Sequence, residues 1–277
     1  MAYYVSSGVT SSGIVLDGEY LEVGGGGLAV GTTINNGWMD IDCDGKAIDT
    51  TMNGGGIYVD HGGMLNNTTI NGGVLKFDGN TAAGVTVNGG SLVVYDHVTV
   101  TNVVWTPCVG HVSIDEGAVV TFASSYSGVY YGSGDQLLSH AAAMSGILLD
   151  GYDASMYVMS GGTAVDTTIN GGRMDIWDGG KAVNAAIDSG GRISVGSGGT
   201  VESATIIRGW MEVEDGGTAA HITISAGSLE VDDDSTAANI TIRGGWMEVD
   251  DDSVVTDVTI TGGWMEVEER ADRKSVV

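Results

Sequence analysis

The chain has few of the residues that break strands, cross-link segments or bind anions. Its 277 residues include 1 Pro, 2 Cys and only 10 Lys and Arg, against 36 Asp and Glu. The formal net charge of -26 argues against nucleic acid or an anionic bilayer as a partner, because phosphate groups are recognised by positive charge. No run reaches the roughly 18 apolar residues of a membrane-spanning helix, so we expect no direct membrane insertion. The scarcity of proline suits a fold that uses nearly every backbone N–H.

A repeat of 18 residues runs through most of the chain. Met247-Glu248-Val249 returns as Met265-Glu266-Val267, and the equivalent segment one repeat earlier is Leu229-Glu230-Val231. Within one repeat, residues 246–250 and 258–260 alternate in polarity, which is the two-residue period of a strand. A unit of this size cannot bury its own apolar face, so its copies must stack on one another.

The period and composition together predict a β-solenoid. With 47 Gly and many β-branched residues, the sequence excludes a helical repeat. We predict an all-β, single-stranded, parallel, right-handed β-helix of about 14–15 coils, with 18 residues in each coil. Equivalent residues of neighbouring coils should stack about 4.8 Å apart. The expected inward files are Met156, Met174, Ile193, Met211, Leu229, Met247 and Met265; Ile169, Ile187, Ile206, Ile224, Ile242 and Ile260; and Val165, Val183, Val201, Ala219, Ala237 and Val255.

A coarser duplication suggests how the chain is divided. Residues 12–18, Ser-Gly-Ile-Val-Leu-Asp-Gly, return at 145–151 as Ser-Gly-Ile-Leu-Leu-Asp-Gly. The 18-residue period fades between these two halves, where Pro107 and a tyrosine-rich stretch occur. We therefore expect a first β-helix half over 1–102 with an N-terminal cap at its start, an irregular joint with a protruding loop over 103–145, a second half over 146–269 and a tail over 270–277.

The repeats are similar to those of a known family. Residues 160–172, Ser-Gly-Gly-Thr-Ala-Val-Asp-Thr-Thr-Ile-Asn-Gly-Gly, resemble the AIDA-type strand-loop-strand repeats of bacterial autotransporter adhesin passengers, and the resemblance covers about 12–102 and 145–269. It implies display on a Gram-negative outer membrane, with a role in cell adhesion, autoaggregation or biofilm formation, and modification of Ser or Thr by a glycosyltransferase. The first residues do not form a signal peptide, so the family alone implies a cell-surface or extracellular location.

The candidate ligand-binding residues lie on the outward face of the last coils. They are Trp210, Trp246 and Trp264 with Glu212, Glu248 and Glu266, and Glu230 completes the acidic file. Aromatic rings beside carboxylates are typical of carbohydrate recognition, whereas the alternative is a structural ladder that shields the sheet. The expected partners are cell-surface glycans or proteins of a host or of other bacteria, including further copies of this chain.

Two other repeated features carry weaker hypotheses. The acidic turns 232–234 and 250–252 could hold Ca²⁺ weakly, but Gly-Gly occurs once per repeat and not at the spacing of a calcium-binding β-roll, so we predict no metal site and no cofactor. Outward threonines are ordinary strand formers, or acceptors of sugars if the resemblance extends that far. These threonines are Thr33, Thr51, Thr69, Thr86, Thr205, Thr223, Thr241 and Thr259.

We predict that the chain is not an enzyme. The regular, short turns leave no room for the walled cleft in which a pair of catalytic carboxylates must be held. The alternative is a carbohydrate-active β-helix enzyme, a polysaccharide lyase or hydrolase, with its site in the joint over 103–145. The residues that could converge there are His111, Asp115, Glu116, Asp135 and His140.

Overall fold

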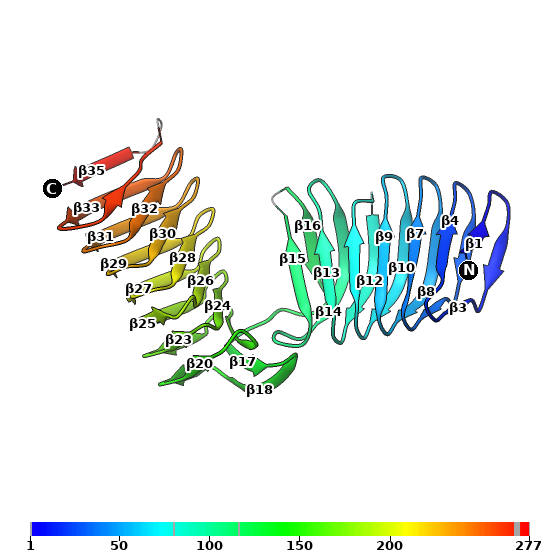
Figure 1. The fold of residues 1–277 in the computed structure, drawn as a ribbon, viewed down its shortest axis with the longest axis horizontal. Helices are drawn as coiled ribbons and strands as arrows, with labels where there is room; N and C mark the ends of the chain where they lie inside the picture. The colour runs from blue at the N-terminus through cyan, green and yellow to red at the C-terminus, as the bar shows by residue number, and fades with distance from the viewer. Residues whose placement is uncertain (1, 80, 116, 269–271, 277) are drawn as a thin grey trace. The chain divides into compact units, whose positions relative to one another are not determined.

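The fold is all-β and built from stacked coils. A computed structural model describes residues 2–79, 81–115, 117–268 and 272–276. These residues divide into two compact units, 1–125 and 126–277. In each unit the strands of successive coils lie side by side (Figure 1). None of the described segments is a helix with the length and apolar character needed to cross a bilayer.

The first unit contains two sheets of parallel strands. One sheet has the order β1 (Ala2–Val5), β4 (Tyr20–Val23), β7 (Gly37–Ile41), β9 (Gly55–Val59), β11 (Val74–Phe77), β13 (Ser91–Val94) and β15 (His111–Ile114). The other has the order β2 (Thr10–Ser12), β5 (Leu28–Val30), β8 (Lys46–Met52), β10 (Met64–Ile70), β12 (Thr81–Val87), β14 (Thr99–Trp105) and β16 (Val119–Phe122), with β3 (Val15–Leu16) and β6 (Thr33–Ile34) paired beside it.

The second unit repeats this plan. One sheet has the order β18 (Gln136–Ala141), β17 (Val129–Ser133), β21 (Ala154–Val158), β24 (Arg173–Ile176), β26 (Arg192–Val195), β28 (Trp210–Val213), β30 (Ser228–Val231), β32 (Trp246–Val249) and β34 (Trp264–Met265). The other has the order β19 (Ala143–Ser145), β22 (Thr163–Val165), β25 (Lys181–Asp188), β27 (Thr200–Ile206), β29 (Thr218–Ile224), β31 (Thr236–Ile242), β33 (Val254–Ile260) and β35 (Asp272–Val276), with β20 (Leu148–Asp150) and β23 (Thr168–Asn170) paired beside it.

The strand register confirms the stacking predicted from the period. Met247 pairs with Leu229 on one side and Met265 on the other, and Ile242 lies in the same way between its neighbours in the isoleucine file. Side chains of both files are fully buried up to the coil of Met247, and only the last members, Met265 and Ile260, are half-buried. The β-solenoid and the inward assignment of these two files are therefore confirmed.

Two members of the third inward file were predicted wrongly. Ala182, not Val183, pairs with Val201, while Val183 pairs with Glu202. Ala182 is buried and Val183 is half-buried, and the same exchange holds one coil earlier, where Ala164 is buried in place of Val165. The cause is the 19-residue step from Ala182 to Val201. Counting back by 18 from Val201 gives Val183, which is one residue too late.

Each long strand bends at a residue with left-handed backbone. His221 in β29 and Asn239 in β31 have φ of 58° and 57°, and the equivalent residues Asp49 and Asn67 of the first unit have φ of 59° and 53°. Asp, Asn and His tolerate this conformation better than other side chains, apart from glycine. The bend brings the residues on both of its sides inward, so Ala219 and Ile222 are both fully buried although they are three apart. The sequence analysis missed this corner.

The segment expected to be a joint contains regular strands. β14, β15 and β16 continue the parallel sheets of the first unit as far as Phe122. β17 and β18 then form an antiparallel hairpin, and β17 pairs antiparallel with β21, with Val129 opposite Val158. One sheet of the second unit thus begins with a hairpin in which β17, the strand next to the coils, runs opposite to them.

The two ends of the chain also contribute strands. β1 and β2 pair in parallel with β4 and β5 and form the outermost strands of their sheets, and whether they act as a cap stays a prediction. In the expected tail, residues 270, 271 and 277 lie outside the described residues, whereas residues 272–276 form β35 beside β33.

A pair of neighbouring substitutions tests the in/out assignment. Met247→Asp would bury an uncompensated charge and should lower the free energy of unfolding by about 3 kcal/mol or more. Glu248→Lys, on the outward face between other carboxylates, should change it by less than about 1 kcal/mol. Chemical denaturation followed by circular dichroism measures both, and equal losses of stability would contradict the assignment.

Candidate functional site

The predicted tryptophans occupy one outward file of the second unit. Trp210 pairs with Ser228, which pairs with Trp246, which in turn pairs with Trp264. The Trp246 and Trp264 rings are stacked, with centroids 5.7 Å apart and planes at 14°. The Trp210 ring instead lies under the guanidinium of Arg192, whose Cζ is 4.4 Å from the ring centroid. The register that the period predicted for these rings is therefore observed.

The predicted glutamates form the next outward file of the same sheet. Glu212, Glu230 and Glu248 pair one coil apart, and Glu266 follows, its backbone N–H donating to the Met247 carbonyl at 2.9 Å. Glu212 is paired with Arg192, which is the residue that also covers Trp210. The six residues chosen from the sequence thus lie together on one face, next to cations that the sequence analysis did not include.

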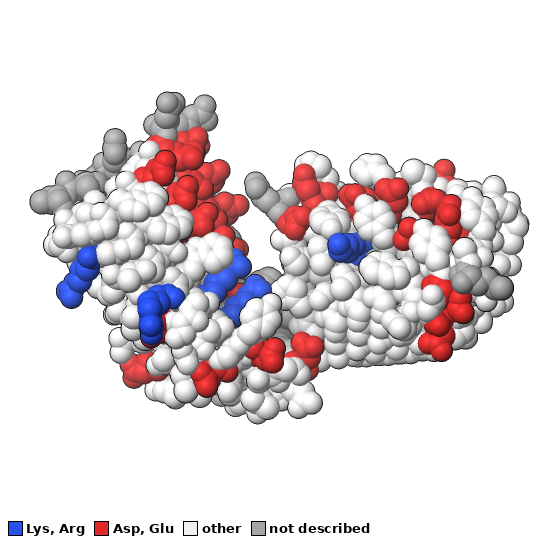
Figure 2. Space-filling view, in the orientation of Figure 1, with Lys and Arg blue, Asp and Glu red and all other residues white. Residues whose placement is uncertain are grey.

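A second acidic file runs beside the first, and two of its members lie in the acidic turns 232–234 and 250–252 noted in the sequence. It contains Asp232, Asp250 and Glu268, and together the two files form a continuous acidic patch on the second unit (Figure 2). Within each of two groups of residues, carboxylate oxygens lie within 4.8 Å of one another. The groups are Glu212, Glu230 and Asp232, and Glu248, Asp250 and Glu268. Ca²⁺ takes about six to eight oxygen ligands, and exposed acidic groups commonly lie this close without an ion, so these groups alone do not define a calcium site.

Burial, together with the stacking of like charges, raises the proton affinity of this patch. Burial, followed by repulsion from Glu212, Glu230 and Asp250, raises the pKa of Asp232 to about 7. Burial and repulsion from Glu212 and Glu248 also raise the pKa of Glu230, although a hydrogen bond from Trp210 opposes the shift. The pKa of Asp250 is raised by burial and by the acidic turn residues Asp233 and Asp251. Part of the patch therefore binds protons in the range where isolated carboxylates are ionised.

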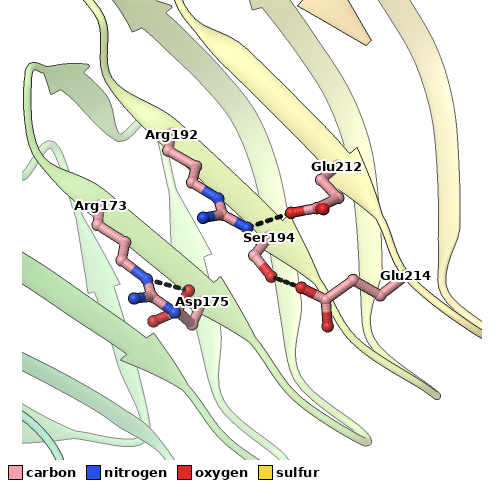
Figure 3. Close-up of polar contacts among 6 residues, drawn as sticks. All are labelled: Arg173, Asp175, Arg192, Ser194, Glu212 and Glu214. Carbon is pink, nitrogen blue, oxygen red and sulfur yellow. Dashed lines mark hydrogen bonds and ion pairs between the residues drawn. The ribbon is translucent and has the colours of Figure 1, made fainter. Parts of the chain in front are cut away.

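A network of arginines and carboxylates begins where the acidic patch ends. Arg173 Nε donates to Asp175 Oδ1 at 2.7 Å, and one coil later Arg192 pairs with Glu212. Ser194 donates to Glu214 across the same face (Figure 3). Asp175 is almost completely buried, and burial raises its pKa although Arg173 opposes the shift.

The sequence carried a signal for this network that was not used. Arg173 and Arg192 are the only basic residues at the outward position that Trp210 and Trp246 occupy in later coils, as the register of the described strands shows. An outward file that changes from arginine to tryptophan marks a change in the surface from mixed charge to acidic and aromatic. That change was visible once the file was aligned by 18 and 19 residues.

The titratable residues of the expected joint are divided between the two units. His111 and Asp115 belong to the first unit, Asp135 and His140 belong to the second, and Glu116 lies outside the described residues. Within the second unit, the His140 ring stacks on Tyr130 at 4.0 Å, and its Nε2 lies 2.8 Å from the Ser127 carbonyl oxygen. Asp135 lies in the turn of the hairpin with φ of 58°. His140 is thus held by its neighbours in the hairpin.

The chain was compared with known proteins. No family model and no curated protein sequence matches it. Among solved structures, it is similar to a crystal structure of a TibC-catalysed, hyper-glycosylated fragment of TibA, with 26% identity over 98% of this chain and 93% of that chain, and a TM-score of 0.45. A TM-score of this size does not by itself establish a common fold. The β-solenoid implied by the resemblance to AIDA-type repeats is confirmed by the stacked coils of this chain's own structure.

The raised pKa of Asp232 predicts how stability depends on pH. Between about pH 4 and 7 the folded protein keeps a proton on this carboxyl that the unfolded chain, with the ordinary pKa of 3.8, releases. The free energy of unfolding should therefore fall as the pH rises through this window and level off above it. Asp232→Asn removes the titrating group and should flatten the slope measured by chemical denaturation from pH 4 to 8.

The control variant for this measurement is Asp215→Asn. Asp215 lies in an exposed turn of the preceding coil, so its replacement also removes one negative charge but leaves the stacked carboxylates in place. It should keep the slope of the unmodified protein. If both variants flatten the slope equally, the effect comes from net charge and not from the position of Asp232 in the file.

Proposed function

We propose that the chain is a non-catalytic, surface-displayed adhesin of the autotransporter passenger type, acting in cell attachment, autoaggregation or biofilm formation. The observation that carries the proposal is the outward face of β28, β30, β32 and β34, where tryptophan and glutamate files repeat from coil to coil. Such a face presents the same groups several times along one line. A binding site of this kind suits an extended ligand such as a glycan chain or a cell-surface protein.

The spacing of the face favours weak contacts that gain by repetition. Each coil offers one ring or small residue and one carboxylate, and the coils follow one another at about 4.8 Å. A single sugar contacts one or two of these groups, whereas a chain or a crowded surface contacts many of them at once. Repeated engagement raises the overall affinity by its effect on local concentration, without any stronger individual contact.

The charge of the face supports a restricted class of partner. Carboxylates accept hydrogen bonds from sugar hydroxyl groups but repel acidic groups. Neutral glycans and proteins with basic surfaces therefore suit the acidic patch formed by Glu212, Glu230, Asp232, Glu248 and Asp250 better than acidic polysaccharides do. Further copies of this chain carry the same negative patch, so self-association through this face is opposed by repulsion and would use other surfaces.

The outward threonine files are the proposed sites of modification by a glycosyltransferase. Thr205, Thr223 and Thr241 are in register in β27, β29 and β31, and each is partly exposed. Thr33, Thr51 and Thr69 form the equivalent file of the first unit. Sugars on these files would cover a face other than the one with the tryptophans, so modification and ligand binding can coexist.

A double substitution tests the tryptophan face. Trp246→Ala with Trp264→Ala removes a stacked pair whose outer ring is 53% exposed, so the coils should stay folded. Binding to multivalent neutral glycans, or adhesion to whole cells, should fall about tenfold or more, while a monovalent sugar shows little binding in either protein. A glycan array and a cell-adhesion assay measure these quantities.

The comparison variant removes the hairpin of the second unit instead. Deletion of residues 124–140 should leave adhesion through the tryptophan face in place if the second unit remains folded, which circular dichroism checks. If this deletion abolishes binding while the double tryptophan variant behaves like the parent, the tryptophan face is a solvent-exposed surface that does not bind the ligand. Turnover of a polysaccharide by the parent, lost on the same deletion, would favour a lyase or hydrolase with its site in the joint.

A further inference from the structure

Trp38 in the first unit lies flat on the backbone of the next coil. Strands β7 and β9 pair so that Trp38 is opposite Gly56. A Cβ atom added to Gly56 would lie 2.4 Å from Cζ3 and 2.7 Å from both Cε3 and Cη2 of the indole. The benzene part of the indole therefore occupies the space that any other side chain at position 56 would need.

Gly56 is required for this space and not for its backbone conformation. Its neighbour Gly55 has φ of 77°, in the left-handed region that favours glycine, whereas Gly56 is not among the residues with positive φ. A glycine within a strand that is not needed for the dihedral angles marks a close approach of another group. Here that group is the Trp38 ring.

The ring keeps a large open surface. Trp38 is 50% exposed although it rests on the neighbouring strand. The outward tryptophan file of the second unit is arranged differently, since Trp210 is covered by Arg192 and Trp246 stacks on Trp264. An indole that lies on a sheet with its outer side open offers a flat apolar surface, on which the C–H face of a pyranose ring can pack.

Hydrogen-bonding groups border this surface. Tyr20, which pairs with Trp38 from the preceding coil, donates its hydroxyl to Asp40 Oδ2 at 2.5 Å. Glu22 lies in the same file as Asp40, one coil before it, and burial together with repulsion from Asp42 raises its pKa. The hydroxyl of Tyr58, next in this file, donates to Asp78 Oδ2 at 3.1 Å.

These groups select for neutral ligands. A carboxylate oxygen is a hydrogen-bond acceptor, so Asp40 and Glu22 can receive hydrogen bonds from the hydroxyl groups of a sugar. The same carboxylates repel a uronate or a sialic acid. A tyrosine held by Asp40 fixes the position of that carboxylate before a ligand arrives, which reduces the entropic cost of binding.

We propose that Trp38, Asp40 and Glu22 form a binding platform for a neutral pyranose within an oligosaccharide, with Gly56 as the residue that lets the indole lie flat. The platform belongs to the first unit and shares the ligand class, but no residue, with the tryptophan face of the proposed function. Either site can therefore fail without the other.

The test is a titration of the full chain with neutral hexaoses made of glucose, mannose or xylose, followed by calorimetry and tryptophan fluorescence. Trp38→Ala should weaken binding of the preferred hexaose about tenfold or more. Gly56→Val keeps the tryptophan but places a side chain where the indole rests, and it should weaken binding to a similar extent. A hexagalacturonate, which has the same shape but carries carboxylates, should bind at least about tenfold more weakly than the neutral chains.

The control variant is Tyr152→Ala in the second unit, which removes an aromatic ring that is 93% exposed and belongs to neither proposed binding site. It should not change binding of a single hexaose to the Trp38 platform. If Gly56→Val proves unstable in thermal unfolding, Gly56→Ser replaces it. In the second unit a serine, Ser228, pairs with Trp210 from the next coil, as Gly56 pairs with Trp38 in the first unit. The proposal is overturned if no neutral hexaose binds, if Trp38→Ala binds like the parent, or if Tyr152→Ala loses binding to the same degree.

Discussion

The structure depends on the parallel pairing of each coil with the next at the same register. Once Met247 is paired with Leu229 and Met265, every other residue of the coil is also placed beside its own equivalent. Inside, this stacks apolar side chains of similar shape, which pack without large voids. Outside, it stacks whatever the repeat contains there, including like charges. The same constraint therefore produces both the stable interior and the acidic face, in which the pKa of Asp232 is raised to about 7.

Departures from the uniform repeat mark the parts of the surface with particular chemistry. Arg192 lies in a coil entered by a 19-residue step, and it joins the tryptophan file to the acidic file by contacting Trp210 and Glu212. Gly56 interrupts a file that holds Tyr20 and Trp38 in the two preceding coils. In both places one unusual residue changes how a neighbouring ring is covered. Function on a solenoid is therefore found in the exceptions to its repeat.

The sequence was sufficient for the period, the inward files and the outward positions of Trp246 and Glu248, because all of these follow from the spacing alone. It was insufficient for Val183, since an extra residue between coils shifts the register without changing the polar pattern. It was also insufficient for Trp38 on Gly56, because the sequence shows that a glycine follows Trp38 one repeat later but not that the ring lies over it. Contacts between coils depend on side-chain shape, and a period carries no information about shape.

The antiparallel hairpin at the start of the second unit limits how such a chain can change in length. β21 pairs antiparallel with β17 on one side and parallel with β24 on the other, so the hairpin can join only a coil whose strand meets β17 in this register. A coil between β28 and β32 has the same kind of neighbour on both sides. Whole repeats can therefore be gained or lost in that region by duplication or deletion of the coding sequence, with the register of all other coils preserved. The reach of the acidic, tryptophan-bearing face can thus evolve by copy number while the hairpin end stays fixed.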